Sequence, residues 1–258
     1  MVGVATTVVA TEEDTMTTTV DEIAPDLFRI STFVPEVGPT GFTFNQFLVR
    51  DDEPFLFHTG ARAMFPAVAE AVGRVLPVDT LRWISFAHVE SDECGAMNQF
   101  LAAAPDAQVV HGELGCMVSL NDLADRAPRP MAADELLVTG RHRWRFLPTP
   151  HVPHNWESGL WFDETDATLL AGDLFTALGD GPAVTSESLI DGALLGEEVF
   201  HSTSVGVATA PTLRRLADLG PRTLATMHGS SFAGDGGRQL LELAAAYEAM
   251  TAPAVTAP

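Results

Sequence analysis

The segment His88-Val89-Glu90-Ser91-Asp92-Glu93 places three side chains that can bind a metal ion at alternate positions. It follows directly on an apolar run, Trp83-Ile84-Ser85-Phe86-Ala87, that is typical of a buried strand. Ligand-type residues in this spacing, just past a strand, are hard to explain as ordinary loop polarity. The alternative is a solvated loop whose carboxylates lie at the start of the helix that we expect at about 94–104.

Further histidine and carboxylate residues stand where other apolar strands end. His151 and His154 follow one predicted strand, Asp173 follows a second, and His228 follows a third. Loops at one edge of a sheet can converge in space, although they are far apart in the chain. The sequence therefore predicts that these strand ends deliver several ligands to one site.

The elements that must position these residues alternate between strands and helices. The expected strands are 27–34, 42–50, 54–60, 81–87, 107–112, 135–139, 143–147, 159–162, 168–171 and 223–227. The expected helices are 61–75, 94–104, 113–126, 209–219 and 236–250, and we expect 174–204 to mix loop and helix. This order indicates a layered α/β fold in one domain, 21–250, between flexible tails at 1–20 and 251–258.

The charge balance excludes several classes of function. The chain of 258 residues has 35 acidic and 14 basic residues, a formal net charge of −21, and all its basic residues are arginine. Without lysine, Schiff-base catalysis and a phosphate-binding P-loop are excluded. The negative field repels nucleic acid and anionic lipid. We therefore expect neither nucleic acid nor a membrane among the partners.

Targeting signals and disulfide chemistry are also not indicated. No apolar run approaches the roughly 20 residues of a membrane span. The first basic residue is Arg29, so the start lacks the positive region of a secretory signal, and we expect a cytoplasmic protein. Cys94 and Cys116 are expected to be reduced, buried thiols.

The set His-x-Glu-x-Asp, His, Asp and His, in this order, resembles the metallo-β-lactamase superfamily. The resemblance is closer to its flavodiiron and oxygen-binding di-iron branch, and it extends from about Asp26 to His228. It implies an αββα sandwich: two mixed β-sheets face to face, helices outside, and the metals at one edge. Hydrolytic members of the superfamily typically show His-x-His-x-Asp-His, where this chain has His-x-Glu-x-Asp-Glu.

The resemblance also implies ligands for two metal ions. These are His88, Glu90 and His154 for the first ion, Asp92 and His228 for the second, and Asp173 as the bridge. We favour His154 over His151 because His154 lies next to Trp156, as in the His-Trp-Pro-Asp segment of flavodiiron proteins. His151 follows Thr149-Pro150, near the place where the hydrolases have Thr-Pro-Gly-His. We expect it to support a ligand or face the pocket.

Four other residues have open roles. Glu93 stands where many flavodiiron proteins have histidine, and it could bind the second metal, hydrogen-bond a ligand, or begin the helix. His58 stands where relatives usually have an aspartate, and it could support the ligand loop or satisfy buried backbone groups. His111 is expected to be structural. His142, between two arginines, is expected at the surface.

Glu90 in place of histidine favours iron or manganese over zinc, because carboxylates suit harder ions of higher coordination number. Three carboxylates and three neutral imidazoles carry three negative charges, which two divalent ions and one bridging hydroxide balance. The same ligands around ferric ions leave positive charge that an oxo bridge can offset. We therefore expect two iron ions with an oxo or hydroxo bridge, with zinc or manganese as the alternative.

These expectations lead to three hypotheses about function. The first is a non-haem di-iron oxidoreductase that binds and reduces or activates O₂, or NO. The second is a dinuclear hydrolase of an ester, thioester, lactone or phosphoester, with metal-bound hydroxide as the nucleophile. The third is an O₂ sensor without turnover.

Flavodiiron proteins carry a flavodoxin domain that supplies electrons. We expect none in this chain and no bound flavin, because the sequence stops about one helix after His228. The expected electron donor is a separate flavoprotein or a rubredoxin-like protein, unless the substrate itself supplies the electrons. A homodimer is expected from the resemblance alone.

Overall fold

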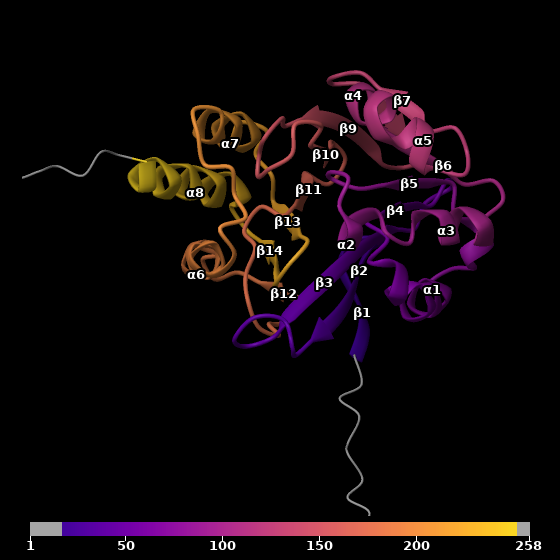
Figure 1. Ribbon diagram of the computed structural model, residues 1–258, viewed down its shortest axis with the longest axis horizontal. Coiled ribbons are helices and arrows are strands. Elements are labelled where there is room, and N and C mark those ends of the chain that lie inside the picture. Colours follow the sequence, from indigo (N-terminus) through magenta and orange to yellow (C-terminus); the bar gives the residue numbers. More distant parts are fainter. Residues whose placement is uncertain (1–16, 252–258) are drawn as a thin grey trace, which may run out of the picture.

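The structure is a computed structural model and describes residues 17–251 (Figure 1). Within these residues the strands form two sheets of seven strands each. The first sheet has the order β1 (Thr17–Ala24), β2 (Leu27–Val34), β3 (Phe42–Val49), β4 (Phe55–Phe57), β5 (Trp83–Ser85), β6 (Gln108–Gly112) and β7 (Arg129–Met131). The second has the order β12 (Val184–Thr185), β14 (Ser231–Ala233), β13 (Thr223–Thr226), β11 (Thr168–Gly172), β10 (Gly159–Asp163), β9 (Arg143–Pro148) and β8 (Leu136–Val138).

Both sheets are mixed. In the first sheet β1 to β4 are antiparallel to their neighbours, and β4 to β7 are parallel. In the second, β11 pairs in parallel with β13 and β12 with β14, while the other neighbours are antiparallel. The helices are α1 (Phe65–Gly73), α2 (Ser91–Cys94), α3 (Met97–Ala103), α4 (Glu113–Gly115), α5 (Asn121–Leu123), α6 (Ile190–Phe200), α7 (Thr209–Ala217) and α8 (Gly236–Thr251).

The sheets pack face to face because alternate side chains of a strand point to opposite faces. Phe47 and Phe57 of the first sheet belong to the same buried cluster as Trp161 and Leu169 of the second. The intervening Leu48 belongs to a separate cluster with residues of α1 and α3. Fully burying each such side chain contributes about 1.5–3 kcal/mol.

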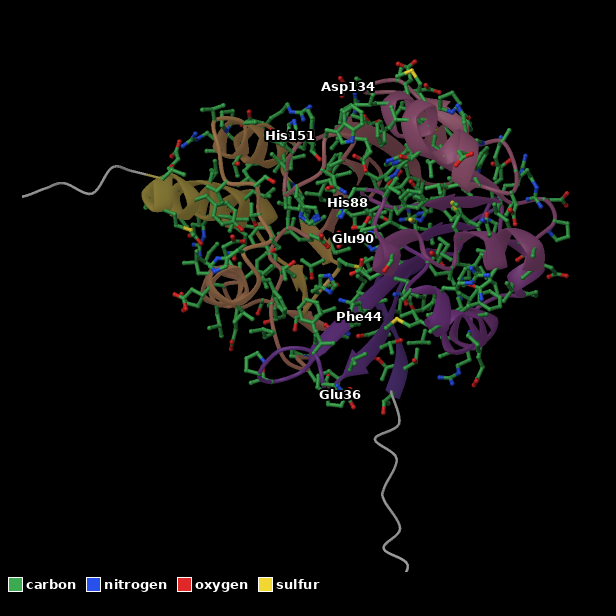
Figure 2. The ribbon with its side chains drawn as sticks, in the orientation of Figure 1. Glu36, Phe44, His88, Glu90, Asp134 and His151 are labelled. Atoms are coloured by element: carbon green, nitrogen blue, oxygen red, sulfur yellow. The ribbon has the colours of Figure 1, made fainter. Side chains whose placement is uncertain are left out.

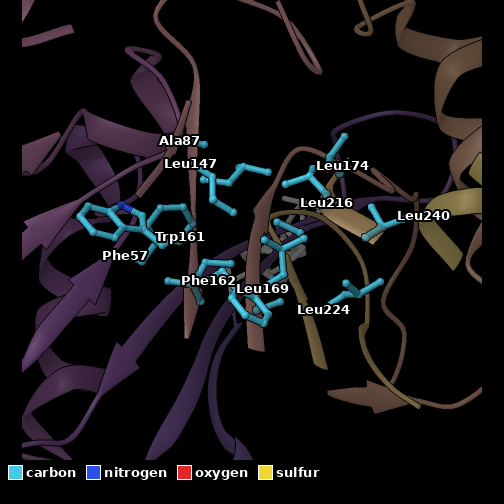
Figure 3. Close-up of a cluster of buried hydrophobic side chains, with 14 of the residues drawn as sticks. Phe57, Ala87, Leu147, Trp161, Phe162, Leu169, Leu174, Leu216, Leu224 and Leu240 are labelled. Carbon is cyan, nitrogen blue, oxygen red and sulfur yellow. The ribbon is translucent and has the colours of Figure 1, made fainter. Parts of the chain in front are cut away.

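The outer helices complete the four layers. The inner cluster continues across the second sheet to Leu213 and Leu216 of α7 and to Leu240 and Leu243 of α8. Figure 3 shows part of it, from Phe57 and Trp161 to Leu216 and Leu240. In Figure 1, α1 and α3 lie outside the first sheet and α7 and α8 outside the second. The predicted αββα sandwich is therefore confirmed.

Some elements differ from the expected ones. The strand β1 begins at Thr17 and pairs antiparallel with β2, so 17–20 are not a tail. The final helix includes Thr251. The expected tails otherwise fall on 1–16 and 252–258, outside the described residues. The helix expected at 94–104 is divided into α2 and α3, and the one expected at 113–126 is interrupted by a π-helical turn, Cys116–Leu120.

The strand β7 was not expected, because it contains Pro130. It lies at the edge of the first sheet, where a proline without an amide hydrogen is tolerated. Over residues 17–251, none of the helices is both long enough and apolar enough to span a membrane.

Candidate metal centre

The predicted ligands meet at one edge of the sandwich, each placed by the end of a strand. His88 and Glu90 follow β5, Asp173 follows β11, and His228 follows β13. Figure 2 shows His88 and Glu90 close together where the two sheets meet. Gly172 allows the end of β11 to approach the segment that follows β5, because a Cβ atom at Gly172 would lie 2.7 Å from the Cβ of Ala87.

Four side chains form the first group. His88 Nε2 lies 2.7 Å from Glu90 Oε2 and 2.8 Å from His154 Nε2, and His154 Nε2 lies 3.1 Å from the same Glu90 oxygen. Asp173 Oδ2 is 3.7 Å from His88 Nε2 and 3.5 Å from His154 Nε2. One ligand atom from each of these four residues can therefore face a common point.

The second group shares Asp173 through its other oxygen. His228 Nε2 lies 3.5 Å from Asp173 Oδ1 and 3.5 Å from Asp92 Oδ2. His228 Nδ1 is 2.7 Å from the backbone oxygen of Thr43 and donates its proton there. Nε2 of the neutral imidazole is then left as an unprotonated ligand atom. Asp173 thus turns one oxygen to each group, as a bridging carboxylate does.

The spacing of these ligand atoms suits a pair of metal ions, and direct hydrogen bonds among the side chains do not satisfy all of them. The two imidazole nitrogens and the Glu90 oxygen are all within 3.1 Å of each other. Neighbouring ligand atoms of one ion, with bonds of about 2.0–2.2 Å, also lie about 3 Å apart. Asp173 Oδ1 is buried and makes no hydrogen bond among the described residues. A cation between the two groups would satisfy it.

The electrostatics of the cluster favour positive charge. Burial alone would lower the pKa of His88, but the nearby Glu93, Glu90 and Asp173 raise it to about 10. Hydrogen bonds from His154 and His88 lower the pKa of Glu90 to about 2. Without metal, protons on the imidazoles balance the carboxylates, and metal ions would displace them.

Glu93 lies behind His88 rather than beside the second group. It is fully buried, and its Oε2 accepts a hydrogen bond from the His88 amide at 2.7 Å. Its Oε1 is 3.4 Å from His88 Nδ1 and 3.4 Å from His58 Nε2. Of the three roles expected for Glu93, this geometry favours contact with a ligand. His58 contacts both Glu93 and, through Nδ1, the backbone oxygen of Asn45 at 3.3 Å.

The structure does not bring His151 into the cluster. His151 is exposed and has a left-handed backbone, with φ of 65°. Its amide donates to the backbone oxygen of Asn155 at 2.7 Å, which closes the turn that presents His154. In Figure 2, His151 lies away from His88 and Glu90. Within residues 17–251, the candidate cluster is formed without the His151 imidazole.

Sequence reasoning missed three residues that surround the cluster: Glu157, Phe42 and Phe200. Glu157 is buried and accepts a hydrogen bond from the Val89 amide at 3.0 Å, which ties the His154 loop to the His88 loop. Phe42 stacks on His228, with ring centres 4.1 Å apart, and Phe200 packs against Phe42. The charge of Glu157 close to His154 was a usable signal, whereas the two phenylalanines had none.

The cluster opens into a small cavity of about 160 Å³. Its walls beyond the proposed ligands are Phe42, Thr176, Phe200 and Ser202. A wider hollow of about 460 Å³ adjoins it and shares Glu90, His154 and Ser202. The inner cavity thus reaches solvent past Glu90, whose side chain is 51% exposed.

The comparisons with known proteins agree with this architecture. The model of the family described as ODP family beta lactamase matches residues 42–229. A curated relative, the putative diflavin flavoprotein A 1 of Nostoc sp. (strain PCC 7120), is 22% identical over 202 residues. The match covers 73% of this chain and 33% of that protein.

Solved structures share the fold. The metal-soaked Flv1 flavodiiron core from Synechocystis sp. PCC6803 has a TM-score of 0.76 at 20% identity, covering 91% of this chain and 61% of that one. The rubredoxin oxygen:oxidoreductase from Desulfovibrio gigas has a TM-score of 0.72 at 17% identity, covering 88% and 62%. This chain thus spans a third of the curated relative and about three-fifths of these structures. The predicted resemblance to the flavodiiron branch is confirmed.

Proposed function

The chain belongs to the ODP family beta lactamase group, and from this premise we propose that it is an oxidoreductase that binds two iron ions and reduces O₂, or NO. The proposed ligands are those that the sequence predicts: His88, Glu90 and His154 for the first ion, Asp92 and His228 for the second, and Asp173 between them. The flavodiiron and rubredoxin oxygen:oxidoreductase names of the structural neighbours support the same class of reaction.

The observation that carries the proposal is the position of Glu90. Its Oε2 lies within 3.1 Å of the two imidazole nitrogens of the first group, in the place of a ligand. Together with Asp92 and Asp173 it makes half of the ligand set carboxylate. Such a set suits iron or manganese, whereas zinc favours sites rich in nitrogen or sulfur.

The walls of the inner cavity favour a small uncharged substrate. The cavity has a volume of about 160 Å³ and opens into the outer hollow of about 460 Å³. Phe42 and Phe200 form an apolar part of the wall, with Phe42 stacked on His228. A diatomic molecule fits this space, and the apolar wall suits an uncharged one such as O₂ or NO.

The side chains of this chain have two tasks in the proposed reaction. They hold and orient the metals, and Phe42 and Phe200 line the space beside them. Protons can enter from solvent through the outer hollow, which adjoins the inner cavity at Glu90 and His154. Reduction of O₂ to two water molecules consumes four protons and four electrons. Two ferrous ions would supply two of these electrons.

The remaining electrons require a reductant. We propose a separate flavoprotein or rubredoxin-type partner, in keeping with the names of the flavodiiron, diflavin and rubredoxin-linked relatives. With such a donor in excess, the reaction proceeds as turnover. Without one, the reduced protein reacts with O₂ once and stops.

The test begins with the protein expressed in iron-rich medium. Mass spectrometry should find about two iron atoms per chain. After anaerobic reduction, exposure to O₂ should produce a charge-transfer absorption band and consume O₂. Two zinc atoms per chain with a silent spectrum would refute the proposal.

The two histidines of the β9–β10 loop supply a matched pair of variants. His154→Ala should lose iron from the first group and abolish the O₂-dependent band, because Nε2 of His154 faces His88 and Glu90. His151→Ala should retain both, because His151 is exposed and outside the cluster. The reverse result would overturn the ligand assignment.

A further inference from the structure

A buried carboxylate stands directly behind the proposed first metal group. Glu93 is fully buried, yet it carries no arginine partner among the described residues. A buried carboxylate is costly unless hydrogen bonds or nearby positive charge compensate it. Glu93 Oε2 accepts a hydrogen bond from the His88 amide at 2.7 Å, and Glu93 Oε1 lies 3.4 Å from Nδ1 of the His88 ring. Both ends of the carboxylate thus contact one ligand.

A second imidazole, that of His58, faces Glu93 from the other side at ion-pair distance. His58 Nε2 lies 3.4 Å from Glu93 Oε1, and the His58 amide donates to the backbone oxygen of Ser85 at 2.7 Å. His58 Nδ1 faces the backbone oxygen of Asn45. Because His58 is also fully buried, its ring has no solvent-exposed alternative position. Glu93 therefore lies between imidazoles that come from the ends of β4 and β5.

The backbone around Glu93 is fixed as well. The amide and the hydroxyl of Thr59 both donate to the backbone oxygen of Glu93, at 2.7 and 3.1 Å. These bonds hold the first turn of α2 against the loop that follows β4. The carboxylate thus lies between two segments, the loops that follow β4 and β5, and a rotation of the Glu93 side chain away from His88 would break its contacts with His88 and His58.

The two metal groups differ in what stands behind His88 and His228. His228 donates its Nδ1 proton to a neutral acceptor, the backbone oxygen of Thr43. His88 has Nε2 in the ligand cluster, so its proton belongs on Nδ1, which faces the Glu93 carboxylate. A carboxylate behind a ligating histidine makes the imidazole a stronger electron donor and fixes its orientation.

We propose that Glu93, held in place by His58, is the positioning residue of His88, and that it makes the first metal position tighter than the second. This inference rests on the proposed two-metal function. Glu93 does not bind metal itself. It fixes the ring so that Nε2 points at the ion, and its negative charge favours the more highly charged state of that ion.

Titration of the metal-free full chain with Co²⁺ alone tests the inference without any O₂ chemistry. The wild type should bind two Co²⁺ ions in two steps, each with its own visible absorption bands. Glu93→Gln preserves the shape and removes the charge, so the tighter step should weaken about 10- to 100-fold and its bands should shift. The weaker step should be unchanged. In the iron-loaded protein the same variant should raise the reduction potential of the first ion.

Asp163→Asn is the matched control, because Asp163 is an equally buried carboxylate beside a histidine at the other end of the second sheet. It should leave both Co²⁺ steps unchanged. His58→Gln should weaken the tighter step less than Glu93→Gln does. Glu93→Asp, which restores the charge on a shorter side chain, should recover part of the affinity and keeps the test open if Glu93→Gln folds poorly.

Two results separate failure of this inference from failure of the proposed function. If the wild type binds two Co²⁺ ions and a folded Glu93→Gln protein matches it in affinity and spectrum, the positioning role is wrong and the metal centre stands. If the wild type binds no Co²⁺ and no iron, both proposals are wrong.

Discussion

Two groups of histidine and carboxylate side chains lie at opposite ends of strands β9 to β11. One is the candidate metal centre, at the edge where Asp173 follows the end of β11. The other is His142 with Asp163 and Asp166, where β9 begins and β10 ends. Residue types and proximity are alike in both, so neither feature alone identifies a metal site.

In the second group the side chains already form hydrogen bonds and ion pairs with one another and with Arg141. His142 Nδ1 donates to Asp163 at 2.8 Å, and the Arg141 guanidinium lies 3.0 Å from His142 Nε2. The same guanidinium pairs with both oxygens of Asp166, at 2.7 and 2.6 Å. Backbone amides, among them that of Thr165, complete the bonds to Asp163. A cation there would have to displace an arginine.

In the candidate metal centre, by contrast, the side chains leave polar atoms without hydrogen-bond partners. Nitrogen faces nitrogen between His88 and His154, and Asp173 Oδ1 is buried without a hydrogen bond among the described residues. Buried polar atoms normally find partners, and groups that do not require an explanation. The bonds that its side chains leave unmade thus distinguish the candidate metal centre from the His142 group.

The largest predicted effect is a loss of metal, and it is tested by replacing one carboxylate in each group. Asp173→Asn should lose both metals, because each oxygen of Asp173 faces one group. Asp163→Asn should keep both metals and reduce the free energy of unfolding by about 3 kcal/mol, because it breaks a buried pair. Metal analysis and urea unfolding of the two variants measure this. Equal metal contents would remove the distinction between the groups.

An intermediate effect is expected from pH, with opposite signs at the two ends. The pKa of His88 in the metal-free protein is about 10, so metal binding at neutral pH must displace its proton. Metal affinity should rise about tenfold per pH unit for each displaced proton, as a chelator competition from about pH 6 to 8 can measure. An affinity independent of pH would contradict the assignment of His88 as a ligand.

The same pKa sets the stability of the metal-free protein. Because it lies above the usual 6.5, the stabilisation by His88 is complete below that value and is lost as the pH rises through about 10. Burial alone would raise the pKa of Asp163. Hydrogen bonds, above all the one from His142, outweigh burial and hold this pKa below its usual value. The stabilisation that Asp163 contributes is therefore lost only as the pH falls. Urea unfolding across alkaline and acidic pH distinguishes the two groups.

The smallest effect is expected for Arg141→Ala. Its side chain is 44% exposed, and exposed ion pairs contribute about 1 kcal/mol or less. Thermal unfolding should show a small loss of stability, with the metal content unchanged. A loss of several kcal/mol would mean that the second group depends on Arg141 far more than its exposure indicates.

Local sequence determined most of the candidate centre. Apolar periodicity predicts the strands, and a chain that leaves a strand must place the next residues at the edge of the sheet. Each of three proposed ligands, His88, Asp173 and His228, comes directly after a predicted strand. Their convergence was therefore predictable from chain geometry. Only short-range information was needed for each of them.

Tertiary structure decided the rest, because the deciding contacts come from distant segments. His142 was expected at the surface between two arginines, but it is buried, since Asp163 reaches it from the next hairpin. The turn closed by Asn155 selects His154 over His151 for the cluster. The sequence left three roles open for Glu93. The contact with His58, which follows another strand, favours the role in which Glu93 contacts the ligand His88. Residue type and spacing predict which groups can act, whereas their partners are set by strands that only the fold brings together.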